Sequence, residues 1–309
     1  MTNSFSSNVF ENFVLSSLEE AYFVQRSLFE KGIINGLVSN GKGEDKATRG
    51  DWKSEETVID YLRIRNLPLR IISEEHGSID LVRKPEYLVI LDGIYGSSAL
   101  VKNPSTRCGT IISLANKLNP SYEDFTFAGI TEFISNKIIY GRKTGLDFGE
   151  GGVFAMKYNS NNKNHIFEKI PKFKNENEDN ARIMIDCYNS DYAQGITKGM
   201  NDFEIFMKEK VVKYLDGENI SGAISSASMF IDLLEGKTDA VFNMVAKGVF
   251  EPPAMYLLTK LLGGSATDLH GNDLGDRKWE QVGMNLEGAL FCSSENLSKR
   301  LIEKINIIS

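Results

Sequence analysis

The sequence predicts a layered fold of the α/β or α+β class, in which helices pack on mixed β-sheets. Apolar residues recur at the spacing of an amphipathic helix over residues 8–31. Short runs rich in Ile, Leu and Val, at 69–73 and 87–91, are typical of buried strands. After residue 180, predicted strands are mixed with predicted helices, which is the pattern of a layered domain.

The first half of the chain begins with the long helix and continues mainly with strands. Glycines between residues 32 and 43 end the helix, and a second helix is expected over 52–65. The apolar side of the first helix is formed by Val9, Phe13, Leu18, Ala21, Val24 and Leu28. The expected strands lie at 69–73, 87–91, 109–115, 125–131 and 136–141.

A polar, Asn-rich stretch at 157–180 separates the two halves of the chain. We interpret it as a surface excursion between two lobes, an N-terminal α+β lobe (1–180) and a C-terminal α/β lobe (181–309). The elements expected after it are a strand at 182–187, helices at 202–215 and 223–235, a strand at 239–243 and a helix after Glu251.

The composition is that of a globular protein: 41% of the 309 residues are hydrophobic, enough for a large core. The net charge of -7 argues against a general nucleic-acid binder. The N-terminus lacks a basic segment followed by an apolar stretch, so no signal peptide is expected. No apolar run approaches the ~20 residues of a membrane span. We therefore expect a soluble, cytoplasmic protein with neither a nucleic-acid nor a membrane partner.

Other familiar motifs are excluded. Residues 36–43 have the G-x4-G-K frame of a phosphate-binding loop, but Gly43 stands where Ser or Thr would hold Mg²⁺, and the segment follows a helix. No G-x-G-x-x-G follows a predicted strand, which argues against a dinucleotide-binding protein. The 3 cysteines and 3 histidines are scattered, which argues against a zinc-finger array or a disulfide scaffold.

Four acidic clusters follow predicted strands or begin predicted helices. These are the places where α/β proteins gather ligands. Ligand sets made only of oxygen suit Mg²⁺ or Mn²⁺ rather than zinc or copper. The clusters lie at 45–51, 73–77, 91–98 and 250–254.

The order and spacing of these clusters resemble the inositol monophosphatase and fructose-1,6-bisphosphatase superfamily. That family carries D-x-x-T-x-x-D, then G-E-E or S-E-E, then D-P-[IL]-D-G-[TS], then an acidic residue that opens a helix ending in A-G-G. The matching residues are Asp45, Thr48 and Asp51 for the first motif, Ser73, Glu74 and Glu75 for the second, and Glu251 with Gly263 for the last. The resemblance implies an αβαβα sandwich of the sugar-phosphatase type.

The third motif departs from the family pattern, because it is D-G-I-Y-G-S-S. Asp92 keeps the first carboxylate, but Tyr95 replaces the second Asp, and a phenol with a pKa of ~10 is a poor ligand for Mg²⁺. Gly93 replaces the proline, which is expected to loosen a turn. Ala99 and Asn243 also differ from residues common in relatives, so the substrate cannot be transferred from them.

The resemblance also implies a role for each site residue. One metal ion would be held by Glu74, Asp92, the carbonyl of Ile94 and Ser97, and a second by Asp92 and Glu251 beside the altered ligand position, Tyr95. Glu74 would thereby take part in catalysis, in which Asp51, with Thr48 or Ser97, accepts a proton from the attacking water. The phosphate and substrate contacts would come from Gly96, Ser97, Ser98 and Asn243.

The expected function is a Mg²⁺-dependent phosphomonoesterase, with Mn²⁺ as an alternative ion. Its substrate would be a small phosphorylated polyol, sugar or nucleotide, and a homodimer or homotetramer is expected by resemblance. The alternative is a family member with impaired catalysis that binds a phospho-ligand or serves as a regulatory or assembly subunit.

Overall fold

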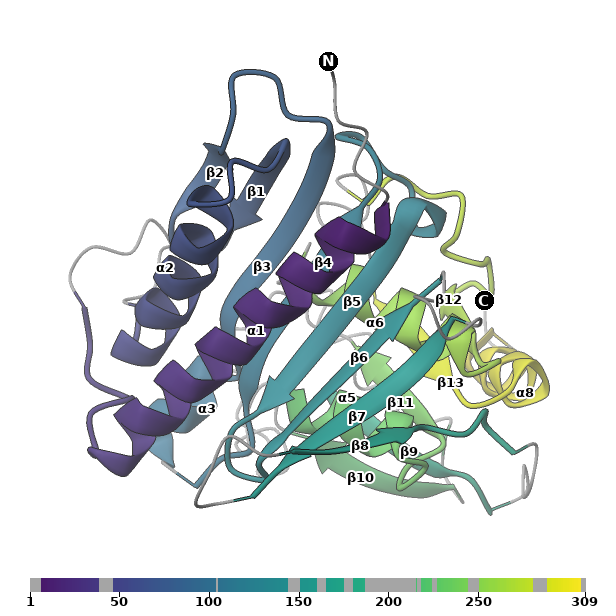
Figure 1. Cartoon of the computed structure of the whole chain (residues 1–309). Coiled ribbons are helices and arrows are strands. Elements are labelled where there is room, and N and C mark those ends of the chain that lie inside the picture. The colour runs from purple at the N-terminus through teal and green to yellow at the C-terminus, as the bar shows by residue number, and fades with distance from the viewer. Residues whose placement is uncertain are drawn as a thin grey trace.

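The fold is described by a computed structural model for residues 7–38, 47–103, 105–143, 151–159, 165–174, 180–186, 215, 218–223, 227–243, 250–279 and 288–306. Helices and sheets alternate in five layers, helix–sheet–helix–sheet–helix (Figure 1). The prediction of a layered αβαβα sandwich is therefore confirmed.

The larger sheet has eight strands within the described residues, in the order β2-β1-β3-β4-β5-β6-β7-β8. β1 and β3 are parallel, and the other neighbouring pairs are antiparallel. The strands are β1 (Leu69–Ser73), β2 (Gly77–Asp80), β3 (Tyr87–Tyr95), β4 (Gly109–Ala115), β5 (Phe125–Glu132), β6 (Lys137–Arg142), β7 (Gly152–Tyr158) and β8 (His165–Lys169). A short helix, α3 (Ser97–Lys102), follows β3, and a 3-10 turn, η1 (Tyr122–Asp124), precedes β5.

Helices α1 (Ser7–Glu30) and α2 (Arg49–Arg63) cover the outer face of this sheet (Figure 1). Their apolar residues, such as Leu18 and Val58, share one core cluster with Leu91 and Ile112 of the sheet. Because helices also lie on its other face, β4 is buried at every position. This explains why the central strands are continuous apolar runs rather than alternating ones.

The smaller sheet has the order β10-β9-β11-β13-β12 within the described residues. Its strands are β9 (Arg182–Asp186), β10 (Asn219–Ala223), β11 (Ala240–Asn243), β12 (Ser265–Asp268) and β13 (Ala289–Cys292). Helix α8 (Glu295–Asn306) packs on its outer face through a cluster that includes Leu290 and Leu301.

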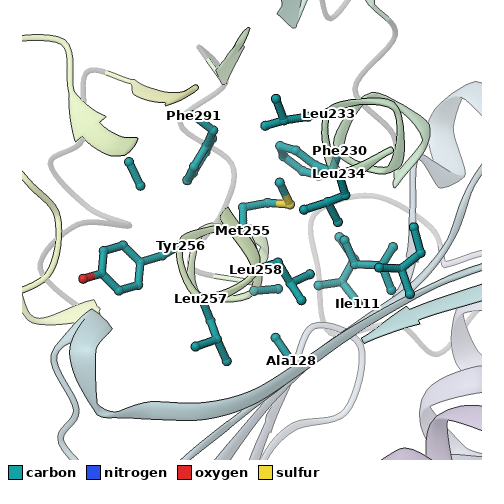
Figure 2. Packing of buried hydrophobic residues seen from close by; sticks show 14 of the residues in the cluster. Ile111, Ala128, Phe230, Leu233, Leu234, Met255, Tyr256, Leu257, Leu258 and Phe291 are labelled. Atoms are coloured by element: carbon teal, nitrogen blue, oxygen red, sulfur yellow. The ribbon is translucent and has the colours of Figure 1, made fainter. Parts of the chain in front are cut away.

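Helices α5 (Ala227–Leu234) and α6 (Glu251–Leu261) form the layer between the two sheets. Figure 2 shows Met255 and Leu258 of α6 among Phe230 of α5, Ile111 of the larger sheet and Phe291 of the smaller one. This inner core fixes α6 against both sheets, so the residue that begins α6 is placed relative to both.

Most predicted elements that lie within the described residues are confirmed. Residues 165–169 of the polar stretch form β8, which pairs with β7, because an edge strand needs no apolar alternation when its side chains are exposed. Residue 223 ends β10, so the helix expected over 223–235 begins later, at Ala227. The helix expected at 202–215 lies almost entirely outside the described residues. The division into lobes at residue 180 stays a prediction.

The helices that the structure describes include none that combines the length and the apolar character needed to cross a membrane.

Candidate functional site

The start of α2 fixes Asp51. Thr48 is the N-cap, and its hydroxyl accepts a hydrogen bond from the Asp51 amide at 3.1 Å. The Asp51 Oδ2 in turn accepts from the Thr48 amide at 3.1 Å and from the Thr48 hydroxyl at 2.7 Å. This reciprocal capping box holds the side chain in the interior, where it is 2% exposed. Asp45, the first residue of the motif, lies outside the described residues.

The pKa of the Asp51 carboxyl lies well above its usual range. Burial is the main cause, since it disfavours the charged form, and the charges of Glu74 and Glu75 raise the pKa further. The hydrogen bonds from Thr48 oppose this rise. Asp51 is thus close enough to Glu74 and Glu75 for their charges to raise its pKa.

The parallel pairing of β1 with β3 brings the second and third motifs together. The register places Ser73 opposite Leu91, so Glu74 and Asp92 follow at the same edge of the sheet. The Glu74 amide also donates to the Leu91 carbonyl at 3.2 Å. Glu74 itself is exposed, in the turn between β1 and β2.

A β-bulge in β3 determines which way the third motif faces. Asp92 pairs with Ile111 and Tyr95 with Gly109, so two residues, Gly93 and Ile94, lie opposite a single residue of β4. Leu88 and Ile90 belong to the inner core, and by alternation Asp92 faces the same layer. The extra residue then turns Ile94 outward and Tyr95 inward, as their core clusters show.

Asp92 is a buried carboxylate without a compensating hydrogen bond on one oxygen. It is 3% exposed, and its Oδ1 has no hydrogen-bond partner among the described residues. The pKa of Asp92 lies well above its usual range, because burial disfavours the charge and neighbouring carboxylates repel it. These neighbours are, in decreasing order of effect, Glu74, Glu251, Asp51 and Glu55.

Glu251 reaches this group from the inner helix layer. It is the first residue of α6 and is 7% exposed. The prolines that follow it suit the first turn of a helix, and a negative charge is favoured at that end of the helix dipole. The structure therefore brings together Glu74, Asp92 and Glu251, although Asp92 and Glu251 are 159 positions apart in the sequence.

The carboxylates of Glu74, Asp92 and Glu251 suit a divalent cation that keeps some of its water ligands better than one coordinated by protein groups alone. In the part of the chain that the structure describes, no three His, Cys, Asp or Glu side chains form a ready ligand set. However, the unpartnered Asp92 Oδ1 and the surrounding negative charge call for a cation. Mg²⁺ commonly keeps several waters and binds through one or two carboxylates. The residues present fit such an ion.

Gly93 does not loosen a turn, so that expectation from the sequence is wrong. Gly93 lies within β3, where its amide donates to Glu55 Oε1 at 3.2 Å and its carbonyl accepts from Thr110 Oγ1 at 2.8 Å. A Cβ atom at this position would come within 2.4 Å of the Asp51 carbonyl oxygen. Glycine is required here because strand β3 approaches the start of α2 so closely.

Tyr95 packs into the inner core. It is 6% exposed, and its ring stacks on that of Phe230 of α5. The side chain of Ile94 lies in the outer core. The group that the resemblance assigned to the metal is the backbone carbonyl of this residue, not its side chain. The ring of Tyr95 therefore serves as a core side chain at the position where the resemblance predicted an altered metal ligand.

The residues expected to hold phosphate lie where β3 passes into α3. Gly96 has φ 101°, a conformation that favours glycine, and Ser97 begins α3. The side chain of Ser98 is not among those that the structure describes. Asn243 ends β11 and is 7% exposed, in the smaller sheet. The binding roles of these residues stay predictions.

Glu55 was not among the site residues predicted from the sequence. This residue of α2 is fully buried and lies one helical turn after Asp51, on the same side of the helix. It accepts hydrogen bonds from the S-E-E turn and from Gly93. The four-residue spacing from Asp51 to Glu55 could have indicated that both side chains lie on the same face of the helix. A Glu in a helix is ordinarily exposed, however, so the spacing alone did not single it out.

Comparison with known proteins places the fold. No family model matches the sequence, and no curated protein matches it. Among solved structures, a putative sedoheptulose-1,7-bisphosphatase from Toxoplasma gondii is similar, with a TM-score of 0.73 and 11% identity over 99% of this chain and 96% of that one. Fructose-1,6-bisphosphatase of Leishmania major has a TM-score of 0.66 and 14% identity over 94% and 93%.

An inositol monophosphatase/NADP phosphatase, solved with NADP and Ca²⁺, is also similar. Its TM-score is 0.66, with 14% identity over 99% of this chain and 98% of that one. The chain has the fold of the inositol monophosphatase and fructose-1,6-bisphosphatase superfamily. This confirms the fold that the motifs predicted.

Proposed function

We propose that this protein is a Mg²⁺- or Mn²⁺-dependent phosphomonoesterase acting on a small phosphorylated polyol, sugar or nucleotide. The observation that carries the proposal is the environment of Asp92: a buried carboxylate with one unpartnered oxygen, surrounded by the charges of Glu74, Glu251 and Asp51. Solved phosphatases with the same fold support the reaction class.

Glu74, Asp92, Glu251 and the Ile94 carbonyl would hold the metal. The ion, when bound, would supply Lewis acidity, lowering the pKa of a water and offsetting charge on the phosphate. Asp51 would accept the proton from the attacking water. Its raised pKa suits this role, because a carboxylate with a raised pKa is a stronger base. Thr48 fixes the Asp51 carboxylate for that step.

The start of α3 would orient the phosphate. The amides of Ser97 and Ser98 lie in the first turn of that helix, where backbone N–H groups have no partner within the helix. The carbonyl of Gly96 is already used, because it accepts from Ala99 and Leu100 at 3.0 Å each. Asn243 would contact the alcohol part of the substrate. Its amide can both donate and accept hydrogen bonds, which suits a hydroxyl-rich ligand.

A non-catalytic phospho-ligand binder is the second candidate. It is favoured by the position of Tyr95, which is committed to the inner core and leaves one carboxylate fewer for a second ion. Such a protein would bind the phosphate ester in the presence of metal without turnover.

We also propose a cytoplasmic location and a homodimeric or homotetrameric state. Among the described residues, Cys108 and Cys292 are free and buried, which suits a reducing compartment.

The test is phosphate release from inositol 1-phosphate, fructose 1,6-bisphosphate and a 3'-phosphonucleotide with Mg²⁺ or Mn²⁺. Glu74→Gln and Asp92→Asn should abolish release, since each removes a carboxylate that would hold the ion. Turnover that is unchanged in both variants would refute this site. Metal-dependent ligand binding without release from any substrate would establish the second candidate instead.

A further inference from the structure

Glu55 lies at the centre of a buried hydrogen-bond network. Its side chain is 0% exposed. Its Oε1 accepts from the amides of Glu74 at 3.1 Å and Gly93 at 3.2 Å, and its Oε2 accepts from the Glu75 amide at 3.0 Å. The Ser73 hydroxyl also donates to Oε2. One carboxylate thus joins helix α2 to the β1–β2 turn and to β3.

The groups that Glu55 joins are those next to the proposed metal ligands. Two of its donors belong to the turn that carries Glu74, and a third is the amide that directly follows Asp92. Asp51 lies one turn earlier on the same helix. A shift of Glu55 would therefore move Glu74, Asp92 and Asp51 relative to one another.

The bond to Gly93 exists because residue 93 is not proline. Proline, which the family pattern places here, has no amide hydrogen to donate. On the other side of the same residue, the Gly93 carbonyl accepts from Gln25 Nε2 at 2.9 Å and from Thr110 Oγ1. Gln25 and Thr110 are themselves fully buried. The backbone beside Asp92 is thus held from two sides, by α2 and by α1 with β4.

The network also keeps a negative charge in place. A buried carboxylate is stable when hydrogen-bond donors surround it, and Glu55 receives four such bonds besides a contact of 3.0 Å between its Oε2 and His76 Nδ1. Among the described residues Glu55 pairs with His76 and with neither Lys nor Arg, and it lies close enough to Asp92 to raise the pKa of that carboxyl. A charge in that position favours a bound cation.

We infer that Glu55 is a positioning residue, which sets the relative geometry of the Glu74 and Asp92 carboxylates for a divalent cation. The inference rests on the proposed function. A positioning role for Glu55 predicts that its loss changes the metal affinity of the folded protein. A purely structural role predicts lower stability of the fold with unchanged metal affinity.

The test compares Glu55→Gln with Glu11→Gln, a matched loss of a fully buried helix carboxylate that lies near Arg142 rather than near Asp92. The chain has 2 tryptophans, Trp52 and Trp279. Both variants also carry Trp279→Phe, so that Trp52 alone is observed. The ring centroids of Trp52 and His76 are 4.1 Å apart. The fluorescence emission of Trp52 therefore reports on the β1–β2 turn even when no metal is bound. Mn²⁺ affinity is measured by calorimetry on folded protein.

We expect Glu55→Gln to weaken Mn²⁺ binding by about 10- to 100-fold, the usual effect of losing a residue that orients a ligand. The Trp52 emission should shift, and Glu11→Gln should change neither quantity. Equal Mn²⁺ affinity in wild type and Glu55→Gln would overturn the inference and leave the proposed function intact. A wild type that binds no Mn²⁺ would overturn both.

If Glu55→Gln does not fold, Ser73→Ala serves instead, because it removes one donor to the same carboxylate. A weaker Mn²⁺ affinity in that variant would support the inference, and an unchanged one would overturn it.

Discussion

The ring of Tyr95 stacks on the ring of Phe230, with centroids 5.5 Å apart and an interplanar angle of 14°. This contact ties the end of β3 to α5 across the inner core. It also places the side chain of residue 95 in the layer that Asp92 faces, where it serves packing.

Tyr95→Asp should therefore have two opposite effects. The lost ring should cost ~3–5 kcal/mol of stability in the metal-free protein, as for other large buried side chains. The restored carboxylate should tighten Mn²⁺ binding and raise phosphate release. Thermal unfolding, Mn²⁺ titration and phosphate release measure these effects. Tyr95→Ala is the control, because it loses the ring without gaining a charge. Equal Mn²⁺ affinity in the two variants would contradict the interpretation that Tyr95 weakens metal binding by replacing an Asp ligand.

Metal should stabilise the wild type but not Asp92→Asn. A ligand that binds only the folded state stabilises it by about 2.7 kcal/mol at 100 times its Kd. The Asp92 Oδ1 has no hydrogen-bond partner among the described residues, so the Asp92→Asn variant should lose most of this gain. The measurement is the Tm with and without Mg²⁺ or Mn²⁺. An equal metal-induced rise in Tm in both proteins would place the ion elsewhere.

Glu11 should make stability fall as pH rises. Burial raises the pKa of Glu11 to about 7 from 4.5, against the opposing effects of the nearby Thr126 hydroxyl and of the charge of Arg142. Because the folded-state pKa is the higher one, the stabilising contribution is complete below pH 4.5 and is lost as pH rises through 7.

The expected slope in that range is at most about 1.4 kcal/mol per pH unit. Glu11→Gln should flatten this part of the profile. Urea unfolding at several values between pH 5 and 8 tests it, and identical slopes in the two proteins would contradict it.

Arg107 should stabilise the attachment of α5 to the larger sheet. Its Nη2 lies 3.1 Å from Glu132 Oε2 and 3.0 Å from Asp232 Oδ1. The Glu132 side chain is 0% exposed, so Arg107→Met would leave a buried charge without its cation. We expect a loss of ~3 kcal/mol in unfolding free energy.

The control for this variant is Arg63→Met, which breaks an ion pair with Asp60 whose side chains are 52% and 60% exposed. It should cost less than ~1 kcal/mol. Equal effects of the two substitutions would show that the Arg107 network contributes no more than a surface pair.

Residue order by itself determined the fold class and the succession of acidic motifs. The strands expected at 69–73 and 109–115 match β1 and β4 residue for residue, because short runs rich in Ile and Leu are typical of buried strands. The start of α6 at Glu251 was also predictable, since Pro252 and Pro253 suit only the first turn of a helix.

Only the tertiary structure decided which way those residues face and what holds them. The bulge at Gly93 and Ile94 reverses the alternation of β3 and turns Tyr95 into the inner core. That bulge depends on contacts with Gln25 and Thr110, which are distant in sequence. Glu55 became part of the site for the same reason. A helical Glu is ordinarily solvated, and only the packing of α2 against β1 and β3 surrounds this one with backbone donors.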